Sequence, residues 1–154
     1  MASEQRPWTR TEMAIANPLI KAMSRVNTWV YRVTGGKVGG TFLRGAPVML
    51  LTTIGRKSGR CWTVPLLYLR DGENIVCVGS KGGMDHHPLW YRNLETNPEA
   101  EVEIGSAVVN VRARTATVAE RADLWPKLVA MYRDYAGYQT RTDRIIPVVI
   151  LSPR

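Results

Sequence analysis

The chain has 154 residues, and its 21 Lys and Arg against 13 Asp and Glu give a net charge of +8. This length fits one domain with its own core, and a hydrophobic fraction of 45% lies in the globular range. No apolar run approaches the roughly 20 residues that a membrane-spanning helix needs, so none is predicted. The positive charge favours an anionic partner, but nucleic acid, anionic lipid and an acidic cofactor remain equally open.

The two cysteines, Cys61 and Cys77, form no CxxC pair, and the N-terminus lacks the apolar core of a signal peptide. Two cysteines in a chain that is not secreted are most simply reduced thiols, so a cytoplasmic location is expected. We set residues 1–16 apart as an N-terminal segment whose order the sequence leaves open. Residues 17–154 are predicted to form a single domain.

The first predicted helix spans residues 17–34, with Asn17 as its N-cap and Pro18 in its first turn. Its apolar residues recur at spacings of three and four and form one stripe: Leu19, Met23, Val26, Val30 and Val33. We favour packing of this stripe on the domain's own core. The alternative is peripheral contact of this basic amphipathic helix with the anionic inner face of the plasma membrane.

The rest of the chain predicts short strands and helices in alternation. Strands are expected at 46–55, 61–72, 73–83 and 145–151, and a hairpin at 100–118. Turn signals lie at Asp71-Gly72 and Gly105-Ser106. Helices are expected at 88–97 and from a capping box at Thr117, with Pro126 breaking or kinking the second. Antiparallel hairpins with inserted helices predict an α+β fold built on a small antiparallel barrel.

A basic turn follows the first strand and contains Gly55, Arg56, Lys57, Ser58 and Arg60. It lacks the spacing of a Walker A loop, and no GxGxxG motif occurs in the chain, so a nucleoside triphosphatase or a Rossmann enzyme is disfavoured. Free backbone N–H groups and clustered cations can hold a phosphate or a carboxylate. The alternative is an ordinary solvated hairpin turn.

A second candidate element is the stretch Ser80, Lys81, Gly82 and Gly83, which ends the strand at 73–83. We take this strand as a neighbour of the first, and its glycines let the backbone approach a ligand closely. The short helix that starts near Pro88 adds a partial positive charge to the same region. Its Trp90 and Asn93 share one helix face, with core packing as the alternative for Trp90.

Three tyrosines, Tyr132, Tyr135 and Tyr138, recur every three residues near the end of the second long helix. They are candidate proton donors that line a substrate, or else a core-facing stripe. The adjacent His86 and His87 lack the companions of a metal site, so no metal is expected. No nucleophilic motif stands out, and an enzyme of this sequence would take its reactive atom from a bound cofactor.

In order and spacing, the sequence resembles the deazaflavin-dependent nitroreductase family, the actinobacterial reductases that use reduced coenzyme F-420. The resemblance covers nearly the whole chain. Seven stretches carry it: "MSRVNTWVYR", "GGTF", "LLTTIGRKSG", "PLLYLRDG", "SKGG", "HPLWYRNLETNP" and "DYAGYQTRTDRIIPVV". It implies a split β-barrel of the FMN-binding type with flanking helices. It also implies transfer of a hydride from the coenzyme to a quinone, a nitroaromatic compound or an activated alkene such as an enone.

The resemblance also implies roles for the candidate residues. The phosphate and the acidic tail of the coenzyme would be held by the basic turn, Gly55, Arg56, Lys57, Ser58 and Arg60. The deazaflavin ring and its linker would contact Pro65, Leu66, Ser80, Lys81, Gly82, Gly83, Trp90 and Asn93. The substrate side would be formed by Ser80, Tyr132, Tyr135 and Tyr138.

The chain departs from the family pattern at two positions. Trp62 stands where relatives often carry an arginine, and Leu67 stands where some members carry a tyrosine. Tail binding and substrate range are therefore expected to differ from those of members that activate nitroimidazoles. Other hypotheses are a flavin- or haem-binding barrel, a deazaflavin carrier without turnover and, with least support, a nucleic-acid-binding module.

Overall fold

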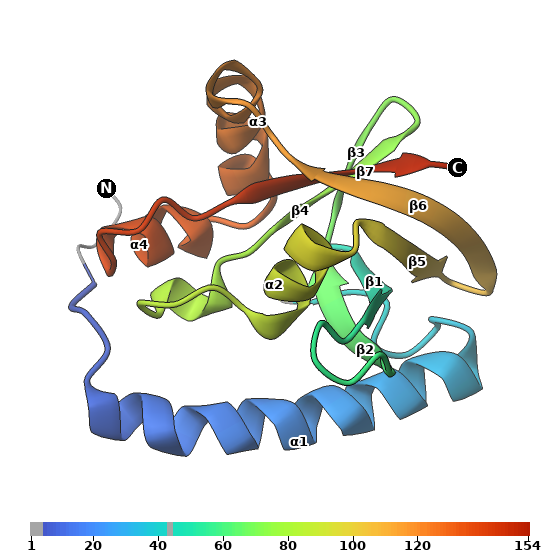
Figure 1. Ribbon diagram of the computed structural model, residues 1–154, viewed down its shortest axis with the longest axis horizontal. Coiled ribbons are helices and arrows are strands. Elements are labelled where there is room, and N and C mark those ends of the chain that lie inside the picture. The colour runs from blue at the N-terminus through green and yellow to red at the C-terminus, as the bar shows by residue number, and fades with distance from the viewer. Residues whose placement is uncertain (1–4, 43–44) are drawn as a thin grey trace.

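The computed structural model describes residues 5–42 and 45–154, and it contains a curled antiparallel sheet of seven strands (Figure 1). Their order across the sheet is β2-β1-β5-β6-β7-β4-β3. The strands are β1 (Val48–Ile54), β2 (Cys61–Leu67), β3 (Leu69–Asp71), β4 (Asn74–Val78), β5 (Glu99–Ile104), β6 (Ala107–Thr115) and β7 (Val148–Pro153). The hairpins predicted at Asp71-Gly72 and Gly105-Ser106 are confirmed.

Four α-helices and one short 3-10 turn accompany this sheet in the described part of the chain. They are α1 (Arg10–Thr34), η2 (Lys81–Gly83), α2 (Leu89–Thr96), α3 (Val118–Met131) and α4 (Asp134–Thr140). Figure 1 shows α1 as a long helix below the sheet, α3 above the sheet and α4 to the left of it. Residues 1–4 of the predicted N-terminal segment, 1–16, lie outside the described residues.

The predicted strand at 61–72 is divided at Tyr68, which corrects the sequence-based assignment. β2 pairs with β1, whereas β3 pairs with β4 at the other edge of the sheet. Because the two edge strands are joined by a single residue, the sheet must curl until its edges approach each other. The α+β half-barrel expected from the hairpins is therefore confirmed.

Three apolar clusters stabilise the curled sheet, and the smallest consists of Tyr31, Val48 and Leu50. The two larger clusters lie on opposite sides of the sheet. The first fills the curl, and its most buried members are Met49, Leu51, Cys77, Val102, Val111 and Leu151. The second lies between the sheet and α3–α4, and its most buried members are Val76, Leu128, Ile146 and Val148. Burial raises the pKa of the Cys77 thiol to about 12, so this cysteine is an inert part of the core.

The first helix begins earlier than predicted, and the assignment of Asn17 as its N-cap is wrong. Thr9 is the N-cap, and its capping box with Glu12 satisfies two backbone groups. Pro18 lies inside the helix, which passes residue 17 without interruption. The proline removes the hydrogen bond to the carbonyl of Ala14, and this cost is small because Ala14 is exposed to water.

The apolar stripe of α1 faces solvent, so its predicted packing on the core is wrong. Leu19 is 59% exposed, Met23 56% and Val26 61%. Tyr31 is the buried residue of α1: its hydroxyl donates to the carbonyl of Val48 (3.2 Å) and accepts from the amide of Gly105 (2.7 Å). The helix is thus attached near its C-terminal end by Tyr31, whose ring packs with Val48 and Leu50 and whose hydroxyl makes these hydrogen bonds, rather than by its stripe.

The second long helix also differs from the prediction. Pro126 lies within α3 without breaking it, because the hydrogen bond that it removes would end on the exposed carbonyl of Ala122. The capping box of Thr117 and Glu120 is confirmed. The chain turns only at Tyr132, so Tyr135 and Tyr138 belong to the separate helix α4.

Candidate functional site

The basic turn forms the loop of the β1–β2 hairpin. The Gly55 amide donates to the carbonyl of Arg60 (2.7 Å), and the Arg60 amide donates to the Ser58 hydroxyl (3.2 Å). A Cβ atom on Gly55 would lie 2.7 Å from Ser58 Oγ and 2.9 Å from Trp62 Nε1, so a side chain at this position would displace one of these two side chains. Trp62 therefore packs against the base of the turn.

The cations of the turn are available for a ligand. Lys57 and Arg60 are exposed and Arg56 is half-buried. Of the ion pairs formed within residues 5–42 and 45–154, none uses these three side chains. Three adjacent charges that lack carboxylate partners favour the binding of an anion.

Asn93 joins the basic turn to the helix α2. Its Oδ1 accepts from the amide of Arg56 (3.1 Å), and its Nδ2 donates to the hydroxyl of Thr53 (3.1 Å). Asn93 is 7% exposed and Thr53 is fully buried, so both hydrogen bonds are shielded from water. Asn93 thus fixes the basic turn in place, and its contact with a cofactor stays a prediction.

The stretch 80–83 forms η2 directly after β4, and it has an unusual backbone. Lys81 (φ 46°), Gly82 (φ 63°) and Gly83 (φ 79°) all have positive φ angles. A Cβ atom on Gly83 would lie 2.5 Å from the carbonyl oxygen of Tyr138. The turn is therefore pressed against α4, next to the tyrosines.

The strand ends that carry the two candidate elements are not neighbours in the sheet, which corrects the sequence-based assumption. β5, β6 and β7 lie between β1 and β4 in hydrogen-bonding order. Because all pairs are antiparallel, β1 and β4 point the same way and end at the same side of the sheet. The chain continues from β4 through η2 into α2, whose Asn93 contacts the basic turn.

Lys81 lies in a positively charged environment. Its pKa is lowered by burial and by the charges of Lys21 and Arg144. Its Nζ contacts Nε2 of His86 (2.6 Å), and Nδ1 of the same ring contacts Asp85 (2.7 Å). The long helix α1 thus contributes a cation, Lys21, to the region of η2, which the sequence pattern did not reveal.

The three tyrosines form a cluster although they come from two elements. Their ring centroids lie 5.1 to 6.3 Å apart, and the hydroxyls of Tyr132 and Tyr138 are 3.2 Å apart. Burial raises the pKa values of Tyr132 and Tyr135, so both phenols remain protonated at neutral pH. Tyr138 is the half-buried member and can reach a ligand.

The other predicted contact residues are parts of the barrel wall or the core. Leu66 packs against the first core cluster, and Pro65 pairs with Leu50 across the β1–β2 ladder. Trp90 is 7% exposed and lies within the same cluster. Core packing accounts for Trp90, and its contact with a cofactor stays a prediction.

Several residues at the site were missed by sequence reasoning. Trp8 donates its indole N–H to the carbonyl of Gly82 (2.7 Å), and the guanidinium of Arg141 lies over its ring. Arg144 donates to three carbonyls of the segment 79–84. The one sequence signal for them is that Arg141 and Arg144 lie close together in a polar loop that follows the tyrosines and has no apolar periodicity.

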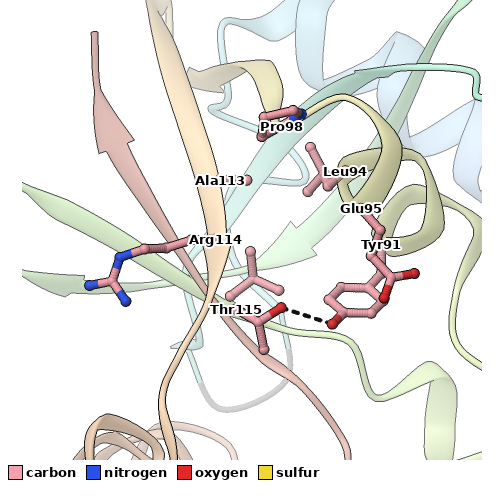
Figure 2. Close-up of a pocket in the computed structure, with 8 residues that line it drawn as sticks. Tyr91, Leu94, Glu95, Pro98, Ala113, Arg114 and Thr115 are labelled. Carbon is pink, nitrogen blue, oxygen red and sulfur yellow. Dashed lines mark hydrogen bonds between the residues drawn. The ribbon is translucent and has the colours of Figure 1, made fainter.

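A pocket of about 240 Å³ lies apart from these elements, between α2 and β6 (Figure 2). Figure 2 shows Tyr91 and Thr115 joined by a hydrogen bond across it (2.8 Å). None of the predicted site residues lines this pocket. Within the described ranges, no three His, Cys, Asp or Glu side chains gather as metal ligands, and no helix could span a membrane.

The curled antiparallel half-barrel with its flanking helices defines a protein of the split-barrel fold. A solved structure from Listeria innocua, described as a pyridoxamine 5′-phosphate oxidase, shares this fold with a TM-score of 0.50 at 11% identity. It covers 84% of this chain and 94% of that one, and supports the fold alone.

Sequence comparison identifies the family. The model of the F420H(2)-dependent quinone reductases matches residues 23–153. Rv3178 of Mycobacterium tuberculosis, whose name places it among these reductases, is 44% identical over 77% of this chain and 99% of its own. The F420H(2)-dependent quinone reductase Rv1261c of the same organism is 37% identical over 84% and 89%.

A solved structure of an F420-H2 dependent reductase, FDR-A, is 42% identical with a TM-score of 0.64, covering 69% of this chain and 94% of that one. The chain belongs to the F420H(2)-dependent quinone reductase family. It is an enzyme whose reductant is F420H(2) and whose acceptor is a quinone. The expected reductase activity and cofactor are confirmed, in preference to flavin, haem or a carrier without turnover.

Proposed function

We propose that the basic turn, residues 55–60, and the turn 80–83 together bind the coenzyme, with the acidic arm on the basic turn. The observation that carries this proposal is the contact of Asn93 with the amide of Arg56 (3.1 Å). It links the basic turn to the helix that follows residues 80–83, so cations from both turns serve one elongated anion. The coenzyme has a phosphodiester and an oligoglutamate tail, which suits this arrangement.

The donors at the two turns fit an anionic and planar group. Arg56, Lys57 and Arg60 have no carboxylate partner in the ion pairs of the described residues, and Lys81 faces His86. The amides of Gly55 and Gly83 donate to carbonyls within their own turns, so the cationic side chains are the donors that these turns offer to a ligand. The bound, reduced deazaflavin supplies a hydride, and the protein holds the acceptor within about 3–3.5 Å.

Tyr138 is the proton donor of this proposal. Tyr132 stays protonated because burial and the hydrogen bond with Tyr138 raise its pKa. If Tyr132 donates to the oxygen of Tyr138 (3.2 Å), the proton of Tyr138 is directed away from Tyr132 and toward an acceptor. A quinone, a nitroaromatic compound and an enone all need the same hydride and proton, so we extend the acceptor range to these classes.

The Tyr138→Phe variant tests this role. We expect its turnover of menadione by reduced coenzyme F-420 to fall about 100-fold, which is typical of the loss of a general acid. Affinity for the coenzyme should change little. The measurement is anaerobic stopped-flow absorbance of the deazaflavin, with menadione, a nitroaromatic compound and cyclohexenone as acceptors.

Tyr91→Phe is the matched control, because it removes a phenol hydroxyl whose partner is Thr115 in the pocket of Figure 2. It should leave turnover unchanged. Full turnover by Tyr138→Phe would exclude the proton-donor role. Reduction of menadione alone among the three acceptors would restrict the enzyme to quinones.

We also propose that α1 contacts an anionic membrane surface, where lipid-soluble quinones reside. Its exposed apolar residues are Ile15, Leu19, Ile20, Met23, Val26, Trp29 and Val33. Basic residues on the same helix include Lys21 and Arg25, both exposed. An amphipathic helix with this composition binds at the interface of anionic bilayers through apolar burial and charge attraction.

Co-sedimentation with vesicles that contain about 30% anionic lipid tests this contact. The Leu19→Gln/Met23→Gln variant should bind at least about 10-fold more weakly, because two apolar side chains no longer enter the interface. The control is Val118→Gln/Ile145→Gln, which alters two exposed apolar residues on other elements. Absence of wild-type binding at low salt would remove the proposal.

A further inference from the structure

Arg144 makes four polar contacts with one short segment, residues 79–87. From the turn between α4 and β7, its Nε donates to the carbonyl of Met84 (2.8 Å) and its Nη2 to the carbonyl of Ser80 (2.8 Å). Its Nη1 donates to the carbonyl of Gly79 (3.2 Å) and contacts Nδ1 of His87 (3.0 Å). A single side chain therefore bridges both ends of the η2 turn.

The turn that Arg144 bridges has a backbone that needs external support. Lys81, a residue with a Cβ, has φ 46°, and Gly82 and Gly83 continue with positive φ. Such a conformation persists where the surrounding contacts determine it. Arg144 orients the carbonyls of Gly79, Ser80 and Met84 toward itself, and Trp8 holds the carbonyl of Gly82.

The charge of Arg144 is not neutralised by its hydrogen-bond partners. These partners are three carbonyl groups and the ring of His87. Burial lowers the pKa of Arg144, and its charge also lowers the pKa of Lys81. The guanidinium thus contributes positive potential to the turn in addition to holding its shape.

We infer that Arg144 is a positioning residue for the coenzyme: it holds residues 79–84 in the form that receives the anion. The identity of this anion rests on the proposed function above. The restraint on the turn is a property of the free protein, so it is measurable without any coenzyme. Binding should depend on Arg144 through both the geometry and the charge of the turn.

The chain offers a matched control in Arg121. This arginine is also half-buried, donates to the carbonyl of Ile146 (3.2 Å) and to Oε1 of Gln139 (3.0 Å), and lies over the ring of Trp125. Its hydrogen bonds end on Gln139 of α4 and on Ile146, just before β7, rather than on residues 79–87. Arg121→Met therefore removes comparable packing and hydrogen bonds without releasing the turn.

The experiment compares Arg144→Met, Arg144→Lys and Arg121→Met by hydrogen exchange and by coenzyme binding. In the free protein, Arg144→Met should accelerate exchange of the amides of Gly83 and Met84 at least about 10-fold. Its Kd for coenzyme F-420, measured by fluorescence titration, should rise at least about 10-fold. Arg144→Lys should restore part of the affinity through its charge, and Arg121→Met should change neither quantity.

Unchanged exchange at residues 79–87 in Arg144→Met would overturn the inference. An equal loss of affinity in Arg121→Met would also overturn it, because the effect would then be a general loss of stability. A third outcome is that exchange accelerates in Arg144→Met while the wild-type protein binds no coenzyme at these turns. That result would support the restraint by Arg144 and refute the proposed coenzyme site. The two proposals are thereby separable.

Discussion

The Arg56→Ala/Lys57→Ala variant is expected to bind coenzyme F-420 at least about 100-fold more weakly than the wild type. Each charge-assisted hydrogen bond to an anion contributes about 1.5–3 kcal/mol, so the loss of two exceeds 2.7 kcal/mol, or about 100-fold in Kd. Turnover at saturating coenzyme should remain within about threefold, because neither side chain acts in the chemical step. Fluorescence titration and steady-state kinetics measure the two quantities.

The control for this variant is Arg70→Ala/Lys127→Ala, which removes the same net charge from exposed positions on β3 and α3. It should leave the Kd nearly unchanged at physiological ionic strength, where charges more than about 8 Å away are screened. An equal weakening in both variants would mean that the net charge of +8 attracts the coenzyme without a defined site. The basic turn would then be an ordinary solvated hairpin.

The Gly83→Ala variant is expected to be the most destabilising of the substitutions considered. Its Cβ would lie 2.5 Å from the backbone oxygen of Tyr138, and the residue has φ 79°. The positive φ costs about 1 kcal/mol and the overpacking about 2 kcal/mol. The sum of about 3 kcal/mol lowers the Tm by roughly 6–12 °C, measured by thermal unfolding. Coenzyme affinity should fall as the turn moves away from α4.

Gly72→Ala separates the two causes of this effect. Gly72 has φ 61°, but its Cβ would meet nothing within 4 Å. This variant should lose only the conformational term of about 1 kcal/mol, or roughly 2–4 °C in Tm. If Gly83→Ala were no less stable than Gly72→Ala, the close approach of η2 and α4 would be incorrect.

Local features of the sequence predicted much of the sheet. The turns at Gly72 and Gly105, both with positive φ, followed from the turn chemistry of Asp-Gly and Gly-Ser between apolar runs. The capping box at Thr117 followed from the spacing of two residues. These signals act within a few residues, so a linear pattern is sufficient to detect them.

The sequence did not predict where α1 begins or which way its stripe faces. Thr9 and Glu12 form a capping box that was present in the sequence, but Asn17-Pro18 offered a competing start. The direction of Leu19 and Val26 depends on how Tyr31 anchors the helix to Val48 and Gly105. Such an anchor joins distant residues and has no periodic signal.

The sequence by itself determined the family and the hairpins, and it placed clustered cations in the turn after the first strand. Only the tertiary structure decided that Tyr68 separates two edge strands, that Tyr132 after α3 meets Tyr138 of α4, and that Arg144 supports residues 79–84. The physical reason is the separation in sequence between the residues that interact, because turns and caps depend on neighbouring residues. The contacts of Arg144 and Asn93 join residues far apart in the chain, and only the curled sheet brings them together.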